Sequence, residues 1–290
     1  MIHIALCTDK HYAKACLACV VSIFENNKDV SIFIHIITKK LPEEFQEYFN
    51  KISKKYNQGI EIITISTEHF SHLKISNRFR EAIYYRFLIP DLINAKKVLY
   101  LDSDTIIVNS IKDLWKTDLD NFACGVIEDQ ACDDIRIHNR IEIDDPYFNS
   151  GVLLINTKYW KENNINQKLT DFIYTNPEKC VYPDQDALNI ILNKKIKFLP
   201  YRYNFQERLY QANFDNLFVH KSKWNNILQE KEVATIIHFT DSIKPWHFEC
   251  THPLKEEFVK YVSLCEVVKF KPSHYFNIKK RLIMWLKNLF

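Results

Sequence analysis

Hydrophobic positions along the chain fall into two alternating kinds of run. Residues 2–7 (IHIALC) and 31–37 (SIFIHII) are almost continuously apolar, which is typical of strands buried on both faces of a parallel sheet. Between them, residues 13–26 carry apolar side chains at helical spacing. The alternation continues with a helix at 42–54, a strand at 60–65, a helix at 77–88 and a strand at 97–101. This order predicts an α/β fold with a doubly wound, mostly parallel sheet.

The second half of the chain repeats the pattern less regularly. It predicts strands at 123–128, 151–155 and 233–239 and helices at 158–175 and 185–193, with an aromatic and Asn-rich stretch at 200–232. No Gly/Ser-rich linker divides the chain. We therefore expect one domain over residues 1–252, followed by a small helical segment at 253–290.

Glycine is unusually rare in this sequence. The 290 residues include three glycines, Gly59, Gly125 and Gly151, whereas average usage of ~7% would give about twenty. This scarcity excludes the glycine-rich phosphate loops of Rossmann and P-loop proteins. Any bound nucleotide must have its phosphates held by side chains and a metal ion.

Cysteine usage and charge indicate the cellular compartment and the class of partner. Most of the eight cysteines lie in apolar runs, and the C-x-x-C of Cys16 and Cys19 lies in a helical pattern without a second metal-binding pair. We expect buried, reduced thiols and a cytoplasmic protein, since no secretory signal or run of ~18 apolar residues occurs. Of the net charge of +3, the residues after Glu266 contribute +6 and the rest −3. Such confinement of basic residues to one tail argues against a nucleic-acid partner.

The strongest local signal is an apolar strand that ends in Asp102-Ser103-Asp104. Ligand sites of open α/β sheets lie at the carboxyl ends of strands, and two clustered carboxylates favour a cation such as Mn²⁺ or Mg²⁺. A polar strand exit into a turn is the structural alternative. The pattern also resembles the haloacid-dehalogenase phosphatases, whose first Asp is a nucleophile, although Ile106 stands where that family has Thr or Val.

A second signal lies near residue 240, where a predicted strand delivers His238 and a loop follows with Lys244. A neutral imidazole can complete a two-carboxylate Mn²⁺ site, and a lysine can meet a phosphate as a point charge. Taken alone, each residue has an ordinary structural explanation. Together with the D-x-D, they form the set of groups that a glycine-poor diphosphate site requires.

Two polar motifs suit a sugar. Asn149, Ser150 and Gly151 precede an apolar run, and Asp184 and Gln185 begin a predicted helix. Asp184 is a plausible N-cap, but these side chains also match the hydroxyl groups of a sugar. Gly151 is expected where a side chain would collide with the backbone or a ligand.

Taken in order, these residues resemble glycosyltransferase family 8, particularly the bacterial lipopolysaccharide and lipooligosaccharide glucosyl- and galactosyltransferases of GT-A fold. The likeness covers nearly the whole chain. It rests on Thr8-Asp9 with Tyr12, Tyr85-Arg86, VLYLDSD, the Asp129 region, FNSGVLLIN, PDQD and H-x5-KPW.

The resemblance implies a retaining hexosyltransferase that uses Mn²⁺, with Mg²⁺ as the alternative ion, and UDP-galactose or UDP-glucose as donor. The implied metal ligands are Asp102, Asp104 and His238. The implied donor-binding residues are Cys7, Thr8, Asp9, Tyr12, Arg86, Asp102, Ser103, Asn149, Ser150 and Lys244. The implied catalytic residues are Gln185, Asp129 and Asp184, with Gln185 close to the anomeric carbon.

The mechanism expected from these residues is front-face attack by the acceptor hydroxyl, because the amide of Gln185 is a poor nucleophile. Asp129, Asp184 and Asp186 are candidate nucleophiles for a double displacement. Asp241 occupies a position where the family usually has glycine, and an acid there can repel the diphosphate. A phosphatase and a non-catalytic sugar-nucleotide-binding protein are the alternative functions.

The basic C-terminal segment predicts contact with a membrane surface. Residues 278–290 place Ile278, Leu282, Trp285, Leu286 and Leu289 on one helical face, with Lys280, Arg281 and Lys287 mostly elsewhere. This pattern is typical of an interfacial helix on anionic lipid; packing on the protein's own core or on a second subunit is the alternative. With the lipid-linked oligosaccharide acceptor that the resemblance implies, we expect a peripheral protein on the cytoplasmic face of the inner membrane.

Overall fold

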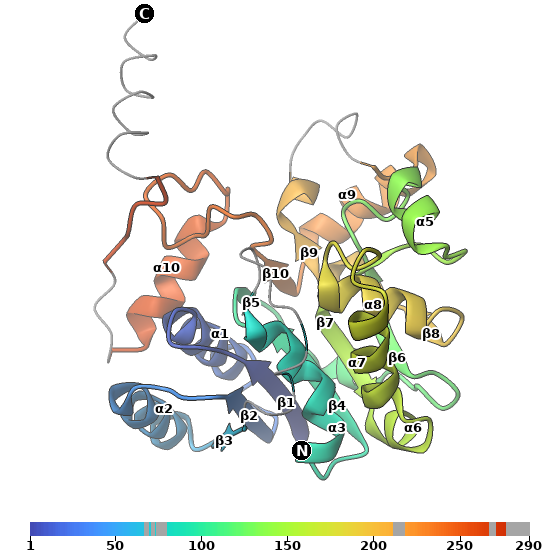
Figure 1. The fold of residues 1–290 in the computed structure, drawn as a ribbon. Helices are drawn as coiled ribbons and strands as arrows, with labels where there is room; N and C mark the ends of the chain where they lie inside the picture. Colours follow the sequence, from blue (N-terminus) through green and yellow to red (C-terminus); the bar gives the residue numbers. More distant parts are fainter. Residues whose placement is uncertain (67–69, 71–72, 74–79, 211–217, 267–270, 277–290) are drawn as a thin grey trace, which may run out of the picture.

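A computed structural model describes residues 1–66, 70, 73, 80–210, 218–266 and 271–276. Its strands are β1 (Ile2–Cys7), β2 (Ile32–Thr38), β3 (Gly59–Thr64), β4 (Lys97–Asp102), β5 (Thr105–Ile107), β6 (Cys124–Glu128), β7 (Phe148–Asn156), β8 (Ile196–Phe198), β9 (Phe205–Gln206) and β10 (Ile236–His238). Seven of them form one sheet in the order β3-β2-β1-β4-β7-β6-β8, and β5, β10 and β9 form a second. The α/β, mostly parallel fold predicted from the sequence is confirmed (Figure 1).

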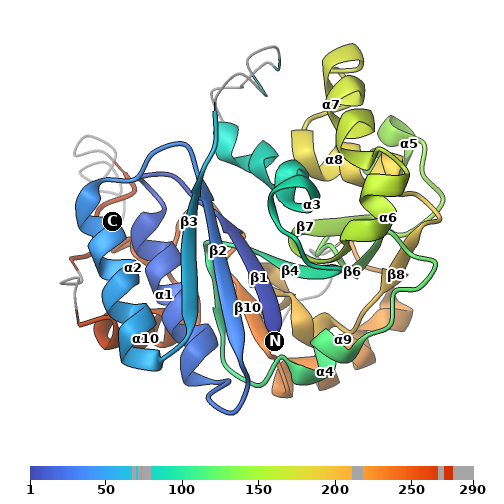
Figure 2. The same ribbon diagram turned by 90° about the horizontal axis from the view of Figure 1, so that it is seen from below.

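The α-helices are α1 (Ala13–Glu25), α2 (Glu43–Tyr56), α3 (Ile89–Leu92), α4 (Lys112–Lys116), α5 (Ile135–Ile141), α6 (Thr157–Glu162), α7 (Ile165–Thr175), α8 (Pro183–Ile191), α9 (Trp224–Glu232) and α10 (Lys255–Leu264). Short 3₁₀ helices are η2 (Glu81–Leu88), η3 (Tyr201–Tyr203), η4 (Glu207–Tyr210) and η6 (Lys221–Lys223). Helices α1, α2 and α10 lie on one side of the large sheet, and α3, α6, α7 and α8 lie on the other (Figure 2).

Two helices differ from the prediction. The described part of the segment predicted as a helix at 77–88 is the 3₁₀ helix η2, followed by α3. Pro90 lacks the N–H that would bond the carbonyl of Arg86, so a continuous α-helix is broken there. The helix predicted at 158–175 is two helices, because Asn164 adopts a left-handed conformation with φ of 50° between α6 and α7, a conformation that asparagine tolerates well.

The order of strands brings distant parts of the chain to one edge. β1 and β4 run parallel, with Cys7 beside Asp102. β7 runs antiparallel to β4, with Val152 opposite Leu101. The carboxyl ends of β1 and β4 therefore meet the amino-terminal half of β7, which carries the polar residues 149–151.

Helix α1 is buried almost completely because it lies between the sheet and α10. Cys16 and Cys19 are on this helix and are fully buried, and all eight cysteines are free thiols. Tyr261 of α10 is also buried, and its hydroxyl lies 2.8 Å from Nδ2 of Asn26. Among the described residues, no helix is long and apolar enough to cross a membrane.

Burial of His252 predicts a pH-dependent stability. The ring packs edge-on against Tyr210 and Phe239, and this burial lowers its pKa from 6.5 to about 4. Since the unfolded chain binds the proton more tightly, stability is lost as pH falls from 6.5 towards 4, by about 3 kcal/mol. His252→Asn is expected to flatten this part of the stability curve, measured by urea unfolding between pH 7 and 4.

A matched control is available at His220, which directly precedes η6. Nδ1 of His252 accepts a hydrogen bond from the backbone N–H of Leu254, and Nδ1 of the exposed His220 accepts one from Ser222, also two residues on. Asparagine preserves this contact at both positions. A flattened curve in His220→Asn as well, or an unchanged one in His252→Asn, would contradict the assignment.

Candidate active site

A cluster of three possible metal ligands lies where the two sheets meet. Asp102 ends β4, Asp104 directly precedes β5, and His238 ends β10, which pairs with β5 so that His238 faces Thr105. Nε2 of His238 lies 3.7 Å from Oδ2 of Asp102 and 3.4 Å from Oδ1 of Asp104. One ligand atom from each residue lies within 4.8 Å of the other two. Two carboxylates and an imidazole form a donor set that suits Mn²⁺.

Gly151 makes this cluster possible. A Cβ added there would collide with the imidazole of His238 and would lie 2.8 Å from Oδ2 of Asp102. The expected collision at Gly151 is therefore with two of the three possible metal ligands. Any larger residue would displace one of them.

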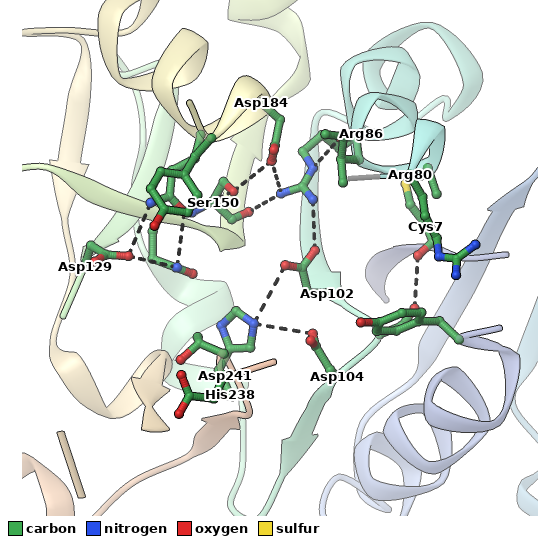
Figure 3. A pocket seen from close by; sticks show the side chains of 18 of the residues that line it. Cys7, Arg80, Arg86, Asp102, Asp104, Asp129, Ser150, Asp184, His238 and Asp241 are labelled. Atoms are coloured by element: carbon green, nitrogen blue, oxygen red, sulfur yellow. Dashed lines mark hydrogen bonds and ion pairs between the residues drawn. The ribbon is translucent and has the colours of Figure 1, made fainter. Parts of the chain in front are cut away.

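Arg86 of η2 lies between the cluster of Asp102, Asp104 and His238 and a second group of polar residues. Its side chain is buried, and its guanidinium lies 3.0 Å from Asp102, 3.1 Å from Asp184 and 2.7 Å from the carbonyl oxygen of Ser150. Burial opposes its charge, but the two carboxylates raise the pKa of Arg86 above its ordinary value. Figure 3 shows Arg86 between Asp102 and Asp184.

The second group surrounds Gln185, the third residue of α8. Oε1 of Gln185 accepts from the backbone N–H of Ser150 at 3.0 Å and from Asn149 Nδ2 at 3.2 Å, and its Nε2 lies 3.3 Å from Asp129. The hydroxyl of Ser150 donates to Asp184 at 2.9 Å. Burial raises the pKa of both Asp129 and Asp184, although hydrogen bonds to Asp129 and the charge of Arg86 beside Asp184 oppose it.

A third group lies at the end of β1, across the metal cluster from Asp129 (Figure 3). Oδ1 of Asp9 accepts from the backbone N–H groups of His11 and Tyr12, which fixes the start of α1. The hydroxyl of Ser103 donates to the carbonyl oxygen of Cys7 at 3.0 Å. The ring of Tyr12 meets Trp246 edge-on at 5.4 Å between centroids.

Lys244 is a buried cation beside the metal cluster. Its Nζ lies 2.8 Å from Oδ2 of Asp104 and donates to the carbonyl oxygen of Phe239 at 2.6 Å. Burial favours the neutral form of each partner, but the attraction between the two charges is stronger. It lowers the pKa of Asp104 and raises the pKa of Lys244. An ammonium group is thus held directly beside the three possible metal ligands.

One cavity of about 660 Å³ joins the three groups. Of the residues that the sequence assigned to metal, donor or catalysis, all but the candidate nucleophile Asp186 line it: Cys7, Thr8, Asp9, Tyr12, Arg86, Asp102, Ser103, Asp104, Asp129, Asn149, Ser150, Asp184, Gln185, His238 and Lys244. Asp186 is fully buried outside the lining and accepts hydrogen bonds from Arg140, Tyr147 and the backbone N–H of Tyr182. These contacts give Asp186 the role of anchoring α8.

The cavity wall also contains residues that the sequence did not single out. Arg80 forms an ion pair with Asp9 at 3.5 Å, and the hydroxyl of Tyr100 donates to Asp102 at 2.5 Å. Asp241, which the sequence analysis did note at the usual glycine position, also lines the cavity. Its backbone N–H donates to Glu207, whose pKa is raised by burial and by the charge of Asp241. Tyr100 lies two residues before Asp102 on the same face of β4, which is the signal that would have identified it.

Comparison with known proteins identifies the family of this chain. The model of glycosyl transferase family 8 matches residues 3–250. The chain belongs to this family. The protein is therefore a glycosyltransferase, and the phosphatase alternative is wrong, because the match covers the D-x-D together with the rest of the cavity wall.

Relatives of this glycosyltransferase include proteins with named activities. Lipopolysaccharide glucosyltransferase WaaO of Escherichia coli (strain K12) is 32% identical over 270 residues, which cover 89% of this chain and 77% of that protein. General stress protein A of Bacillus subtilis (strain 168) is 27% identical over 91% of this chain and 93% of its own length. The crystal structure of galactosyltransferase LgtC with donor and acceptor sugar analogues aligns with a TM-score of 0.83 at 24% identity, over 92% of this chain and 98% of that one. This likeness confirms the GT-A fold.

Proposed function

We propose that this glycosyltransferase moves galactose or glucose, with retention of configuration, from a UDP-sugar to a hydroxyl group of a lipid-linked lipopolysaccharide or lipooligosaccharide saccharide. The observation that carries the proposal is the single cavity in which the Asp102, Asp104 and His238 cluster separates the end of β1 from the group around Gln185. This arrangement matches the order of nucleoside, diphosphate and hexose along a sugar nucleotide.

The protein groups around the cluster suit each part of that donor. Thr8, Asp9 and Tyr12 lie on the side proposed for uridine, and Asn149 and Asp184 lie on the side proposed for the hexose. Acceptor-only carboxylates and amide groups are suited to sugar hydroxyls. Two of the similar proteins, a glucosyltransferase and a galactosyltransferase, are named for the transfer of hexoses, which agrees with a hexose donor.

Catalysis requires stabilisation of the charge that develops on the departing diphosphate. Asp102, Asp104 and His238 would hold Mn²⁺, which supplies Lewis-acid neutralisation of that charge when bound. Lys244 would leave Asp104 and bind a phosphate oxygen. Arg86 fixes Asp102 by its charge and thereby keeps the metal-binding carboxylate in place.

Front-face attack fits the side chains on the hexose side. The bond between the anomeric carbon and the phosphate oxygen breaks, the acceptor oxygen bonds to the same face, and its proton passes to the departing phosphate. Gln185, whose amide orientation is fixed by Asp129 and Ser150, would lie beside the cationic carbon. Mass-spectrometric trapping of a hexosyl group on Asp129 or Asp184 would instead establish a double displacement.

Release of UDP tests the proposed reaction. A panel of UDP-sugars is incubated with the protein, with Mn²⁺ present or chelated. Manganese-dependent UDP release is expected from UDP-galactose or UDP-glucose, and Asp104→Asn is expected to reduce it by about 100-fold or more because a metal ligand is lost.

Asp113→Asn is the control, since this carboxylate of α4 is 80% exposed and does not line the cavity. Binding of UDP-sugars without turnover, even with saccharide acceptors present, would leave only a sugar-nucleotide-binding role. Turnover that survives chelation would contradict the metal dependence.

The basic C-terminal segment supports a membrane-bound location for this reaction. Residues 277–290, which include the predicted interfacial face, lie outside the described residues. Residues 271–276 are joined to the main domain, since Ser273 pairs with Trp246 and Phe248 through the backbone. We propose that the segment from 277 onward binds an anionic membrane surface and places the protein on the cytoplasmic face of the inner membrane.

Deletion of residues 277–290 is expected to release the protein from phosphatidylglycerol vesicles in sedimentation while UDP release continues. Replacement of Lys280, Arg281 and Lys287 by glutamine is the companion variant, expected to weaken binding by about 1 kcal/mol per charge. Unchanged sedimentation of the deletion variant would contradict membrane attachment through this segment.

A further inference from the structure

Asn204 lies between the metal side and the hexose side of the cavity, although it does not line the cavity itself. It follows η3 and precedes β9, and its side chain is fully buried. Its Oδ1 lies 2.9 Å from Nδ1 of His238, and its Nδ2 lies 2.9 Å from Oδ1 of Asn149. One carboxamide group therefore contacts a metal-binding residue and a proposed hexose-binding residue.

The direction of these hydrogen bonds is set by their outer partners. The backbone N–H of Gly151 donates to Oδ1 of Asn149 at 3.0 Å, and Nδ2 of Asn149 faces the acceptor carboxylate of Asp129 at 3.1 Å. Asn204 must then present its amide N–H to Asn149 and its oxygen to His238. Nδ1 of His238 consequently carries a proton, and in the neutral ring Nε2 then offers its lone pair on the side of the two aspartates.

The segment that carries Asn204 is itself fixed under the cavity. β9 pairs in parallel with β10, with Gln206 beside His238. The side chain of Gln206 accepts from the backbone N–H of Gln130 at 2.9 Å and donates to the carbonyl oxygen of Glu128 at 2.8 Å. Gln206 is thus bound to the backbone on both sides of Asp129. Asn204, two residues before Gln206, is thereby held in place and can fix the side chains of His238 and Asn149.

We propose that Asn204 is a positioning residue that sets the tautomer of His238 and couples metal binding to hexose binding through its carboxamide group. The inference rests on the proposed function. Hydrogen-bond partners of metal-binding histidines typically change metal affinity by 10–100-fold. Since coupling between two ligands is reciprocal, loss of the carboxamide would weaken the effect of each ligand on the other.

Two substitutions separate the two contacts. Asn204→Ala removes both, whereas Asn204→Asp keeps an acceptor for His238 and removes the donor to Asn149. Mn²⁺ affinity is measured by electron paramagnetic resonance without nucleotide. It is expected to fall about 10–100-fold in the alanine variant and to stay close to that of the wild type in the aspartate variant.

The second measurement compares binding of UDP with that of UDP-galactose and UDP-glucose by calorimetry at saturating Mn²⁺. The ratio of these affinities isolates the hexose. Whatever preference the wild type shows for the hexose is expected to be lost in both variants, because a carboxylate at 204 would oppose the acceptor oxygen of Asn149.

Asn27→Asp is the matched control. Asn27 is buried to the same degree, donates to the carbonyl oxygen of Ile23 and accepts from the backbone N–H of Ile111, away from the cavity. It should lose stability without a change in Mn²⁺ affinity. Unchanged Mn²⁺ affinity in Asn204→Ala would overturn the inference. A loss of Mn²⁺ affinity in Asn204→Asp as large as that in Asn204→Ala, with the same loss of hexose preference, would also overturn it. A wild-type protein that binds no Mn²⁺ would overturn the proposed function as well.

Discussion

Replacing Gly151 with alanine is expected to abolish metal binding while leaving the sheet folded. The new methyl group would lie on the imidazole of His238 and 2.8 Å from Oδ2 of Asp102. His238 is hydrogen-bonded to Asn204, and Asp102 is paired with Arg86. Neither side chain can therefore move without losing a buried hydrogen bond. A decrease in Mn²⁺ affinity of about 100-fold or more is expected, together with loss of manganese-dependent UDP release.

Gly125 provides the comparison. It lies on β6 in the same sheet, and a Cβ there would meet the methyl group of Leu199 at 2.9 Å. That side chain end is flexible, so Gly125→Ala should cost stability and leave Mn²⁺ affinity intact. Equal Mn²⁺ affinity in Gly151→Ala and the wild type would show that the metal is not bound by His238 and Asp102.

Arg86→Met is expected to destabilise the protein by about 3–5 kcal/mol. The substitution removes the one charge that lies between Asp102 and Asp184 and leaves a buried carboxylate, Asp184, without its cation. Methionine has a similar volume, so the loss measures charge and hydrogen bonding more than packing. Urea unfolding measures the stability, and UDP release from the folded variant is expected to fall about 100-fold or more because Asp102 is no longer fixed.

Arg202→Met is the control for removal of an arginine from an ion pair. Arg202 contacts Glu230 at 2.6 Å, but its side chain is 37% exposed and it does not line the cavity. A smaller loss than for Arg86→Met is expected, because Arg202 is partly exposed and water can take its place beside Glu230, with UDP release unchanged. Equal destabilisation by the two substitutions would contradict the special role of Arg86.

Much of the fold could be predicted because its central strands are parallel and buried. β1 and β2 are almost continuously apolar, and this composition identifies them without knowledge of their partners. β7 was predicted to begin at residue 151, whereas it begins at Phe148. Asn149 and Ser150 are polar because they line the cavity, so hydrophobic patterning cannot extend the strand through them to Phe148.

The site was predictable where a motif supplies several ligands in a few residues. Asp102 and Asp104 are separated by one residue, and Lys244 lies in the loop that follows His238. Asn204 and Arg80 were missed because their roles depend on contacts with residues 34 and 71 positions away, His238 and Asp9. These contacts depend on how β9 and η2 pack, and the weak hydrophobic pattern of those segments does not predict that packing.

The antiparallel pairing of β4 and β7 restricts where this chain can change in length. Leu101 lies opposite Val152, so the D-x-D and Gly151 are aligned by the register of two strands that enter the site from opposite directions. A deletion of one residue within either strand would shift one partner by about 3.3 Å and turn the following side chains to the other face. Insertions and deletions that separate this chain from its longer relatives should therefore lie in the connections, and an alignment that places a gap inside 97–104 or 148–156 should be rejected.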